Sequence, residues 1–275
     1  MKKLKVLTMM LALTLVLSLC ACDSAKPADT QNTDPETTES VVPATNGVII
    51  LGTSADYPPY EFHKIIDGKD EIVGFDIALA KLIAAELGKE LEIRDIPFDS
   101  CLIELNTDKV DFVIAGMSPD PDRDAFFTDI YYKTTQCVLV RKGEAATYTD
   151  AASLAGKTVG AQLGSAQEKA AKAELADSTL VSLQKVPDLL LDLTAKKSDA
   201  VVMEKLVALT YLQTNDNMEI AFDLEYMTAG CAVAVKTGNQ ELLDQVNAIV
   251  NKALSDGTLD RYIEEAAQLA AGQLD

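Results

Sequence analysis

Residue types that carry most enzyme and metal chemistry are scarce in this sequence. Its 275 residues include one histidine, His63, with no cysteine or second histidine at the spacing of a metal site. Neither a Gly-x-x-x-x-Gly-Lys loop nor a Gly-x-Gly-x-x-Gly motif after a strand is present, so nucleotide phosphates have no evident cradle. We expect His63 to lie in a solvated loop, and we expect no catalysis, no metal and no cofactor.

Other side chains suit the binding of a small charged molecule. Arg123 carries a planar guanidinium, the side-chain group that can hold a carboxylate through two parallel hydrogen bonds. Tyr57 begins a Tyr-Pro-Pro-Tyr turn after an apolar run, which puts rings at the carboxyl end of a strand, where open α/β sheets bind ligands. Ser165 starts a helical pattern and has Glu168 three residues on, which predicts a capping box. The free backbone N–H groups at such a helix N-terminus also suit a carboxylate.

The elements that would position these residues alternate between strand and helix. From Gly47 onward, short β-branched runs at 48–51, 91–93 and 111–114 predict strands, and helical spacing between the first two predicts a helix that ends at Gly88. This alternation is typical of an α/β fold with mainly parallel sheets.

A second set of elements repeats this theme and is followed by a return. The predicted strands are 157–160, 179–183 and 199–202, and the predicted helices are 166–175, 188–196 and 204–212. A strand at 231–235 and helices at 240–254 and 259–270 then follow. Such a chain leaves one lobe, builds another and comes back, so the two crossings form a hinge.

The N-terminal residues predict export and a lipid anchor. A lysine-rich start and a short apolar run make residues 1–21 a secretory signal peptide. The sequence Leu-Cys-Ala-Cys at 19–22 resembles the bacterial lipobox, so Cys22 would be lipidated and the protein held at the outer face of the cytoplasmic membrane or in the periplasm. Residues 22–46 are rich in Asp, Glu, Pro and Thr and predict a flexible tether.

The composition excludes one class of partner. The formal net charge of −19 makes nucleic acid an improbable ligand, because phosphate recognition needs clustered Lys and Arg. Three cysteines follow Cys22, and an odd number argues against a full disulfide framework.

Three segments resemble the amino-acid solute-binding proteins (extracellular family 3) of ATP-binding-cassette importers. They are Gly-Thr-Ser-Ala-Asp-Tyr-Pro-Pro-Tyr-Glu-Phe at 52–62, Ala-Gly-Met-Ser-Pro-Asp-Pro-Asp-Arg at 115–123, and Val-Gly-Ala-Gln-Leu-Gly-Ser-Ala-Gln-Glu at 159–168. They stand in the family's order over nearly the whole chain from Gly47. The resemblance implies a periplasmic-binding-protein-like clamshell (type II), with lobes joined by two hinge strands.

The same resemblance implies domain bounds and partners. Residues 47–132 would form the first part of lobe 1, residues 133–230 the hinge and lobe 2, and residues 231–275 the return to lobe 1. The protein would be a monomer that binds a free amino acid and delivers it to the permease subunits of the importer. A rival interpretation is an extracytoplasmic lyase of the same fold, similar to cyclohexadienyl dehydratases.

Site residues are implied by position in the family's motifs. Tyr57 and Phe98 would stack on the ligand, Arg123 with Ser118 and the loop at Gly116 would hold its α-carboxylate, Ser165 would contribute from lobe 2, and Glu204 would face its α-ammonium. The full set of expected ligand-binding residues is Ser54, Tyr57, Phe98, Gly116, Ser118, Arg123, Ser165 and Glu204.

Two expectations concern specificity and redox state. Ser54 stands where relatives that recognise amide, imidazole or basic side chains often have an acid, so we expect a neutral amino acid. Cys137 and Cys231 would lie near the two hinge strands, where a disulfide is possible, although two reduced buried thiols are the stronger expectation.

Overall fold

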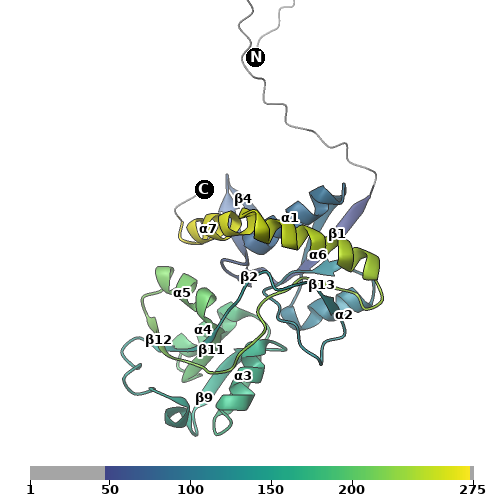
Figure 1. Ribbon diagram of the computed structural model, residues 1–275. Helices are drawn as coiled ribbons and strands as arrows, with labels where there is room; N and C mark the ends of the chain where they lie inside the picture. Colours follow the sequence, from purple (N-terminus) through teal and green to yellow (C-terminus); the bar gives the residue numbers. More distant parts are fainter. Residues whose placement is uncertain (1–46, 273–275) are drawn as a thin grey trace, which may run out of the picture. The chain divides into compact units, whose positions relative to one another are not determined.

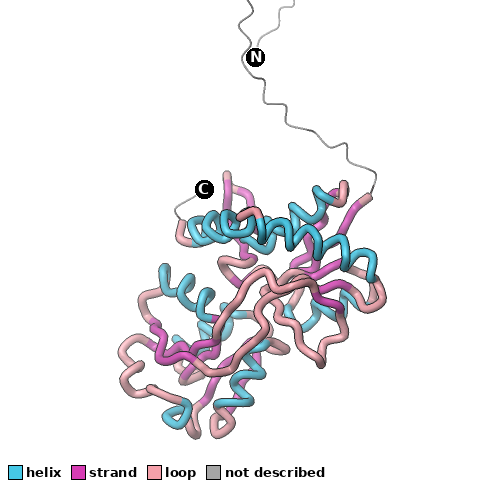
Figure 2. Tube along the Cα trace, viewed as in Figure 1, coloured by secondary structure: helices cyan, strands magenta, loops and turns pink. Residues whose placement is uncertain are grey.

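The computed structural model describes residues 47–272, so the predicted signal peptide, Cys22 and the tether at 22–46 lie outside the described residues. Two five-stranded sheets, each covered by helices, form the centres of two lobes (Figure 1). The trace crosses between the lobes along loop segments rather than through a helix (Figure 2). This arrangement confirms the predicted fold class of two α/β lobes.

The sheet of lobe 1 has the strand order β5-β1-β6-β13-β7. Strand β1 pairs in parallel with β5 and β6, whereas β13 runs antiparallel to β6 and β7. Because β13 comes from the last part of the chain, the return to lobe 1 is built into the sheet itself. The strands are β1 (Val48–Thr53), β5 (Glu90–Asp95), β6 (Phe112–Val113), β7 (Phe126–Phe127) and β13 (Ala234–Val235).

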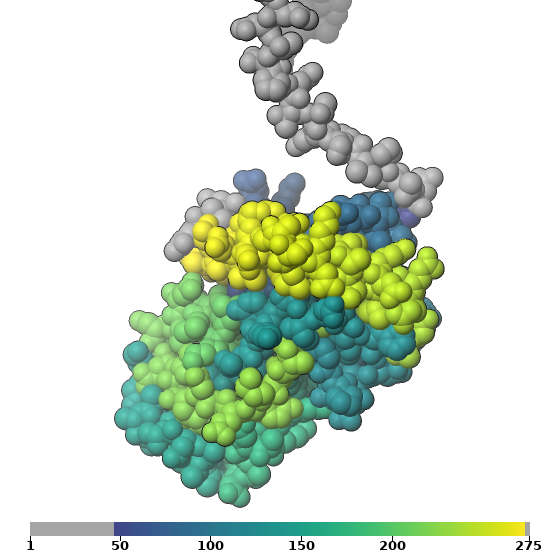
Figure 3. Space-filling view, in the orientation of Figure 1, coloured from purple at the N-terminus to yellow at the C-terminus, as the bar shows by residue number. Residues whose placement is uncertain are grey.

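The helices of lobe 1 come from both parts of the chain that build it, the first part and the returning last part. Helix α1 ends just before Gly88, which has a positive φ of 64° that few other residues adopt. Helices α6 and α7 pack on α1 and on each other and form one continuous cap in the space-filling view (Figure 3). The helices are α1 (Phe75–Glu86), the 3₁₀ turn η1 (Phe98–Ser100), α2 (Cys101–Asn106), α6 (Gln240–Ser255) and α7 (Thr258–Ala270).

A small three-stranded antiparallel sheet, β2-β3-β4, follows directly after β1. Its strands are β2 (Asp56–Tyr57), β3 (Glu61–Ile66) and β4 (Lys69–Val73). Asp67 and Gly68, both with positive φ, form the turn between β3 and β4. His63 therefore lies in a strand, beside Asp70 at 3.0 Å, and not in the loop that the sequence predicted.

The sheet of lobe 2 has the order β10-β9-β11-β8-β12, in which β10, β9 and β11 are parallel and β8 and β12 antiparallel. Strand β8 is the entry from lobe 1. Its strands are β8 (Gln136–Arg141), β9 (Thr158–Gln162), β10 (Thr179–Leu183), β11 (Ala200–Glu204) and β12 (Met218–Asp223). Its helices are η2 (Ala151–Leu154), α3 (Ala166–Glu174), α4 (Val186–Thr194) and α5 (Lys205–Thr214).

The two crossings between the lobes meet at an antiparallel bridge between Tyr132 and Cys231. Gly230, with a φ of 110°, lies so close to the other crossing that an added Cβ would stand 2.4 Å from the carbonyl oxygen of Tyr132. Only glycine fits there without moving backbone. Cys137 and Cys231 are both buried free thiols, so the possible disulfide between them is absent.

Among residues 47–272, no helix has both the length and the apolar character needed to cross a membrane.

Candidate functional site

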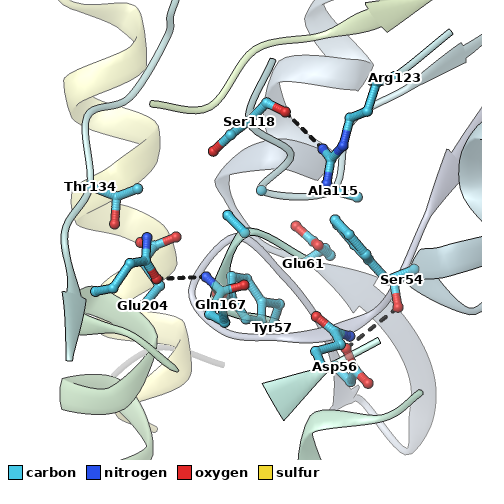
Figure 4. A pocket seen from close by; sticks show the side chains of 15 residues that line it. Ser54, Asp56, Tyr57, Glu61, Ala115, Ser118, Arg123, Thr134, Gln167 and Glu204 are labelled. Carbon is cyan, nitrogen blue, oxygen red and sulfur yellow. Dashed lines mark hydrogen bonds between the residues drawn. The ribbon is translucent and has the colours of Figure 1, made fainter. Parts of the chain in front are cut away.

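A small cavity is lined by residues of both lobes and of the first crossing. Its remaining volume is about 10 Å³, roughly the space that one water molecule needs. The two lobes are therefore closed around the cavity, and a molecule larger than water can enter only if they separate. The lining residues are Ser54, Asp56, Tyr57, Glu61, Phe98, Ala115, Gly116, Ser118, Arg123, Thr134, Gln136, Gln162, Ala166, Gln167 and Glu204, most of them visible in Figure 4.

Arg123 marks one end of the cavity. Its guanidinium donates to the carbonyl oxygen of Ser118 at 2.8 Å (Figure 4). It also donates to the carbonyl oxygen of Gly164, in lobe 2, at 3.0 Å. It also lies over the Phe98 ring, 5.5 Å from the centroid, which favours a cation at that place. These contacts hold the fork at the junction of the lobes, ready for an anionic group.

Aromatic rings and a glycine loop form the walls. Tyr57 and Phe98 are both buried. Gly116 has a positive φ of 53°, and an added Cβ would stand 3.2 Å from the Tyr57 ring. The loop therefore lies against the ring as closely as the backbone permits, and a larger residue would narrow the cavity.

Glu204 is the acid contributed by lobe 2. It stands at the junction of β11 and α5, is 1% exposed, and accepts a hydrogen bond from the Tyr60 hydroxyl of lobe 1 at 2.5 Å. Burial raises its pKa to about 8, although hydrogen bonds from Tyr60 and Thr134 oppose that rise. In the absence of a cation its charged form is disfavoured, so a ligand ammonium would satisfy it.

Asp56 was not predicted, yet it lines the same cavity. Burial raises its pKa to about 6, and Lys185 opposes the rise. Its carboxylate accepts a hydrogen bond from the backbone N–H of Val186, in lobe 2, at 3.1 Å. Ser54, the residue on which the neutral expectation rested, stands 3.5 Å from the other carboxylate oxygen (Figure 4). The acid in this part of the cavity is therefore Asp56, two residues after Ser54, the position where the family resemblance indicated an acid.

Glu61 is a third acid on the cavity wall and is fully buried at the first position of β3. Figure 4 shows it among the lining side chains, between Ala115 and Tyr57. Together with Asp56 and Glu204, it makes three buried carboxyl groups against the single guanidinium of Arg123 among the lining residues. The cavity therefore has an excess of acid.

Ser165 is absent from the lining set, contrary to expectation. Its hydroxyl accepts from the backbone N–H of Glu168 at 3.1 Å and donates to the carbonyl oxygen of Gln162 at 2.6 Å. Both bonds belong to the start of α3. The side chain of Glu168 accepts from Gly164 rather than from Ser165, so the N-cap is present without the reciprocal bond of a capping box.

Glutamine side chains line the lobe 2 wall instead. Gln167 donates to the Tyr57 hydroxyl at 3.0 Å and to the side-chain oxygen of Gln136 at 2.8 Å. The first bond crosses between the lobes. Gln162 also lines the cavity.

Outside the cavity, ion pairs join the lobes. Lys169 of α3 pairs with Asp120 at 2.7 Å and with Asp122 at 2.9 Å, and Lys185 lies 3.6 Å from Asp95. These groups are partly exposed, so each pair contributes little by itself. Each pair joins a lysine of lobe 2 to an acid of lobe 1, so these contacts exist only while the lobes are closed.

Of the eight residues expected to bind ligand, the structure brings seven to the cavity and leaves Ser165 outside it. The residues that the sequence did not single out are Asp56, Glu61, Ala115, Thr134, Gln136, Gln162, Ala166 and Gln167. All of these except Thr134 and Gln136 stand inside the motifs already quoted. The acid next to Tyr57 was the available signal.

Residues 49–266 match the family of bacterial extracellular solute-binding proteins, family 3. The arginine-binding extracellular protein ArtP of Bacillus subtilis (strain 168) is 34% identical over 220 residues, which cover 78% of this chain and 83% of that protein.

Two solved structures are similar in sequence and fold. One is the amino acid ABC transporter substrate-binding protein AbpA of Streptococcus pneumoniae bound to L-arginine, with a TM-score of 0.79, 38% identity and coverage of 82% of this chain and 96% of that one. The other is an ancestral arginine-binding protein bound to glutamine, with a TM-score of 0.73, 34% identity and coverage of 80% and 98%. All three similar proteins are binding proteins, in agreement with the expectation that this chain is not an enzyme.

Proposed function

This chain belongs to the bacterial extracellular solute-binding proteins, family 3, and we propose that it binds a free amino acid with a cationic side chain, arginine foremost, for an ATP-binding-cassette importer. ArtP and AbpA, which resemble it over most of its length, bind arginine. The proposal replaces the neutral ligand inferred from Ser54.

The observation that carries the proposal is the excess of buried acid in the cavity. A zwitterion brings one carboxylate and one ammonium, which Arg123 and Glu204 match. Asp56 and Glu61 are then left without a cation of the ligand. Burial raises the pKa of both groups, for Asp56 despite Lys185 and the Val186 N–H, so their charged forms are costly in the cavity. A guanidinium or ammonium on the ligand's side chain offsets that cost, whereas a neutral side chain leaves it in place.

Closure follows from the placement of these groups. Arg123 and Asp56 belong to lobe 1, and Glu204 belongs to lobe 2. A ligand that pairs with both lobes stabilises the closed state relative to the open one, because the second set of contacts exists only after closure. The closed form would be the one that the permease recognises.

Membrane attachment remains part of the proposal. Lipidation at Cys22, after removal of residues 1–21, would hold the binding protein beside its permease, and the tether at 22–46 would let it reach. The lyase alternative has less support, since the similar proteins are binding proteins.

Binding of arginine and of citrulline, measured by calorimetry and thermal shift, tests the ligand class. Citrulline is nearly isosteric with arginine but carries no side-chain charge. At a hundred times its dissociation constant, arginine should add about 2.7 kcal/mol to the free energy of unfolding. Citrulline should bind at least about tenfold more weakly, a difference of about 1.4 kcal/mol. Equal affinities for the two would contradict the proposal.

A further inference from the structure

Two carboxyl groups from different elements meet at the wall of the cavity. Glu61 begins β3 and Asp76 lies in the first turn of α1, and both side chains are 0% exposed. Glu61 lines the cavity, whereas Asp76 lies behind it and is not a lining residue. Their side chains are within hydrogen-bonding reach of each other.

Asp76 is half satisfied by the protein. Its Oδ2 accepts from the backbone N–H of Gly116 at 2.8 Å and from the hydroxyl of Tyr131 at 2.9 Å. Its Oδ1 and both carboxyl oxygens of Glu61 have no donor among the described residues. If both groups were ionised, three buried oxygens would therefore be unpaired. One proton on Glu61 removes the conflict, because the O–H can donate to Asp76.

We infer that Glu61 and Asp76 share one proton while the cleft holds no cationic ligand, and that a cationic ligand side chain at Glu61 displaces it. Glu61 would then be a specificity-determining residue that exchanges a proton for a guanidinium or ammonium. The inference rests on the proposed function, since it concerns ligands with a charged side chain.

The surroundings of the pair favour this assignment. Burial, and then the Asp76 carboxylate, raise the pKa of Glu61 well above its ordinary range, whereas the pKa of Asp76 is raised only to about 6. The proton therefore belongs mainly to Glu61. The other titratable groups that act on Glu61 or are acted on by it are acids, phenols and thiols: Asp56, Tyr57, Cys101, Tyr131 and Cys231.

The exchange is balanced in charge and atoms. Glu61 loses its proton to solvent, becomes a carboxylate, and pairs with the incoming cation. The proton that leaves and the cation that arrives each carry one positive charge, so the net charge of the pair, counted together with the ligand side chain, is unchanged. A neutral side chain brings no such compensation, so Glu61 keeps its proton. Well below the ligand-free pKa of Glu61, the ratio of the arginine affinity to the citrulline affinity should therefore rise with pH, by up to about tenfold per pH unit.

Calorimetry of the wild-type protein at pH 7.5, in buffers of different ionisation enthalpy, counts the protons released. At that pH Asp56 and Asp76, with pKa values of about 6, are already mostly ionised. Glu204, with a pKa of about 8, releases its proton to solvent when the ammonium of either ligand binds, so this release is common to both. Arginine should therefore release about one proton more than citrulline.

Glu61→Gln should abolish that difference and weaken arginine binding by about tenfold or more. Glu71→Gln, an exposed acid in the same small sheet, is the matched control and should behave like wild type. The comparison of the two ligands on the wild-type protein does not depend on the folding of the variant.

The outcomes separate this inference from the proposed function. If arginine is not preferred over citrulline, the proposed function fails. If arginine is preferred but releases no additional proton, or if Glu61→Gln leaves the proton count unchanged, only the shared-proton inference is overturned.

Discussion

The two ends of the cavity differ in how the protein treats charge. At the Arg123 end, the guanidinium is held by carbonyl oxygens of both lobes and by an aromatic ring, so its position is fixed before any ligand arrives. At the other end, Asp56 and Glu61 are buried acids with raised pKa values. The first end is preorganised for an anion, such as the α-carboxylate that every amino acid has. At the second end the burial of the two acids is unfavourable by itself, and only a ligand with a cationic side chain would offset it.

The largest effect should come from the preorganised end. Arg123→Ala should weaken binding of arginine and of citrulline alike by about 3–5 kcal/mol, or two to four decades in Kd, because the buried carboxylate loses its partner. Arg123→Lys should recover only part of that loss, since an ammonium cannot form the fork. Calorimetric titration measures both. Arg94→Ala, at a half-buried arginine of β5 that does not line the cavity, is the control, and near wild-type affinity of Arg123→Ala would place the carboxylate elsewhere.

At the other end, the change should discriminate between ligands. Asp56→Asn should weaken the binding of arginine by about 2 kcal/mol, roughly thirtyfold in Kd, because the ligand's cation loses a buried charge partner. Citrulline, which has no charge to pair there, should bind almost unchanged. Competition titrations of both ligands report the ratio. The control is Asp70→Asn, at an exposed acid of the small sheet, and a parallel loss for both ligands in Asp56→Asn would contradict a role in side-chain recognition.

The pH dependence of stability should reveal the buried acids Glu204 and Asp56 in the ligand-free protein. In the closed ligand-free state the pKa of Glu204 is about 8 against 4.5 ordinarily, so the folded protein binds this proton more tightly than the unfolded chain. The resulting stability is complete below about pH 4.5 and is lost as the pH rises toward 8. Asp56 acts in the same direction, with a pKa raised from 3.8 to about 6.

Because the lobes can open and rehydrate these acids, the loss should be limited to about 1–2 kcal/mol, or a few degrees in Tm. Thermal denaturation across this pH range measures it. Glu204→Gln, or saturating arginine, should flatten the slope. A ligand-free Tm that rises between pH 5 and 8 would be the wrong sign.

The smallest effect should come from Ser165, the expected ligand residue that lies outside the cavity. Ser165→Ala removes an N-cap, so it should reduce stability by about 1 kcal/mol and leave the arginine affinity within about twofold. Chemical denaturation and calorimetry give the two quantities, with Ser255→Ala at a helix end as the control. A large loss of affinity with little loss of stability would return Ser165 to the binding site.

Much of the fold could be predicted because apolar spacing is local information. Phe75, Leu79 and Ile83 recur at helical spacing, and they are the buried face of α1. The small sheet β2-β3-β4 was missed although Asp67-Gly68 is a strong hairpin signal. Strand β12 was also missed, because a half-buried strand at a sheet edge has weak alternation.

The site was predictable at the end that depends on residue type. Arg123 could be placed at the cavity from its motif, because the Gly116–Ser118 loop that accompanies it there is close to it in sequence. The side-chain end depends on which acids become buried, and that is decided by contacts far along the chain. Asp56 is enclosed by Val186 and Tyr211 of lobe 2, which sequence spacing does not reveal. Weighing Ser54 alone therefore led to a neutral ligand, whereas Asp56 supports the cationic ligand proposed above.

The small sheet β2-β3-β4 has a consequence for how such proteins diversify. Asp56, Tyr57 and Glu61 all stand within six consecutive positions of this one hairpin, whereas Arg123, Glu204 and the Lys169 ion pairs that accompany closure belong to other elements. The hairpin also carries contacts between the lobes, because Asp56 accepts from the backbone N–H of Val186 and the Tyr57 hydroxyl accepts from Gln167. A mutation in this short stretch can therefore alter the choice of cargo and the closure of the lobes together, while the Lys169 ion pairs stay in place.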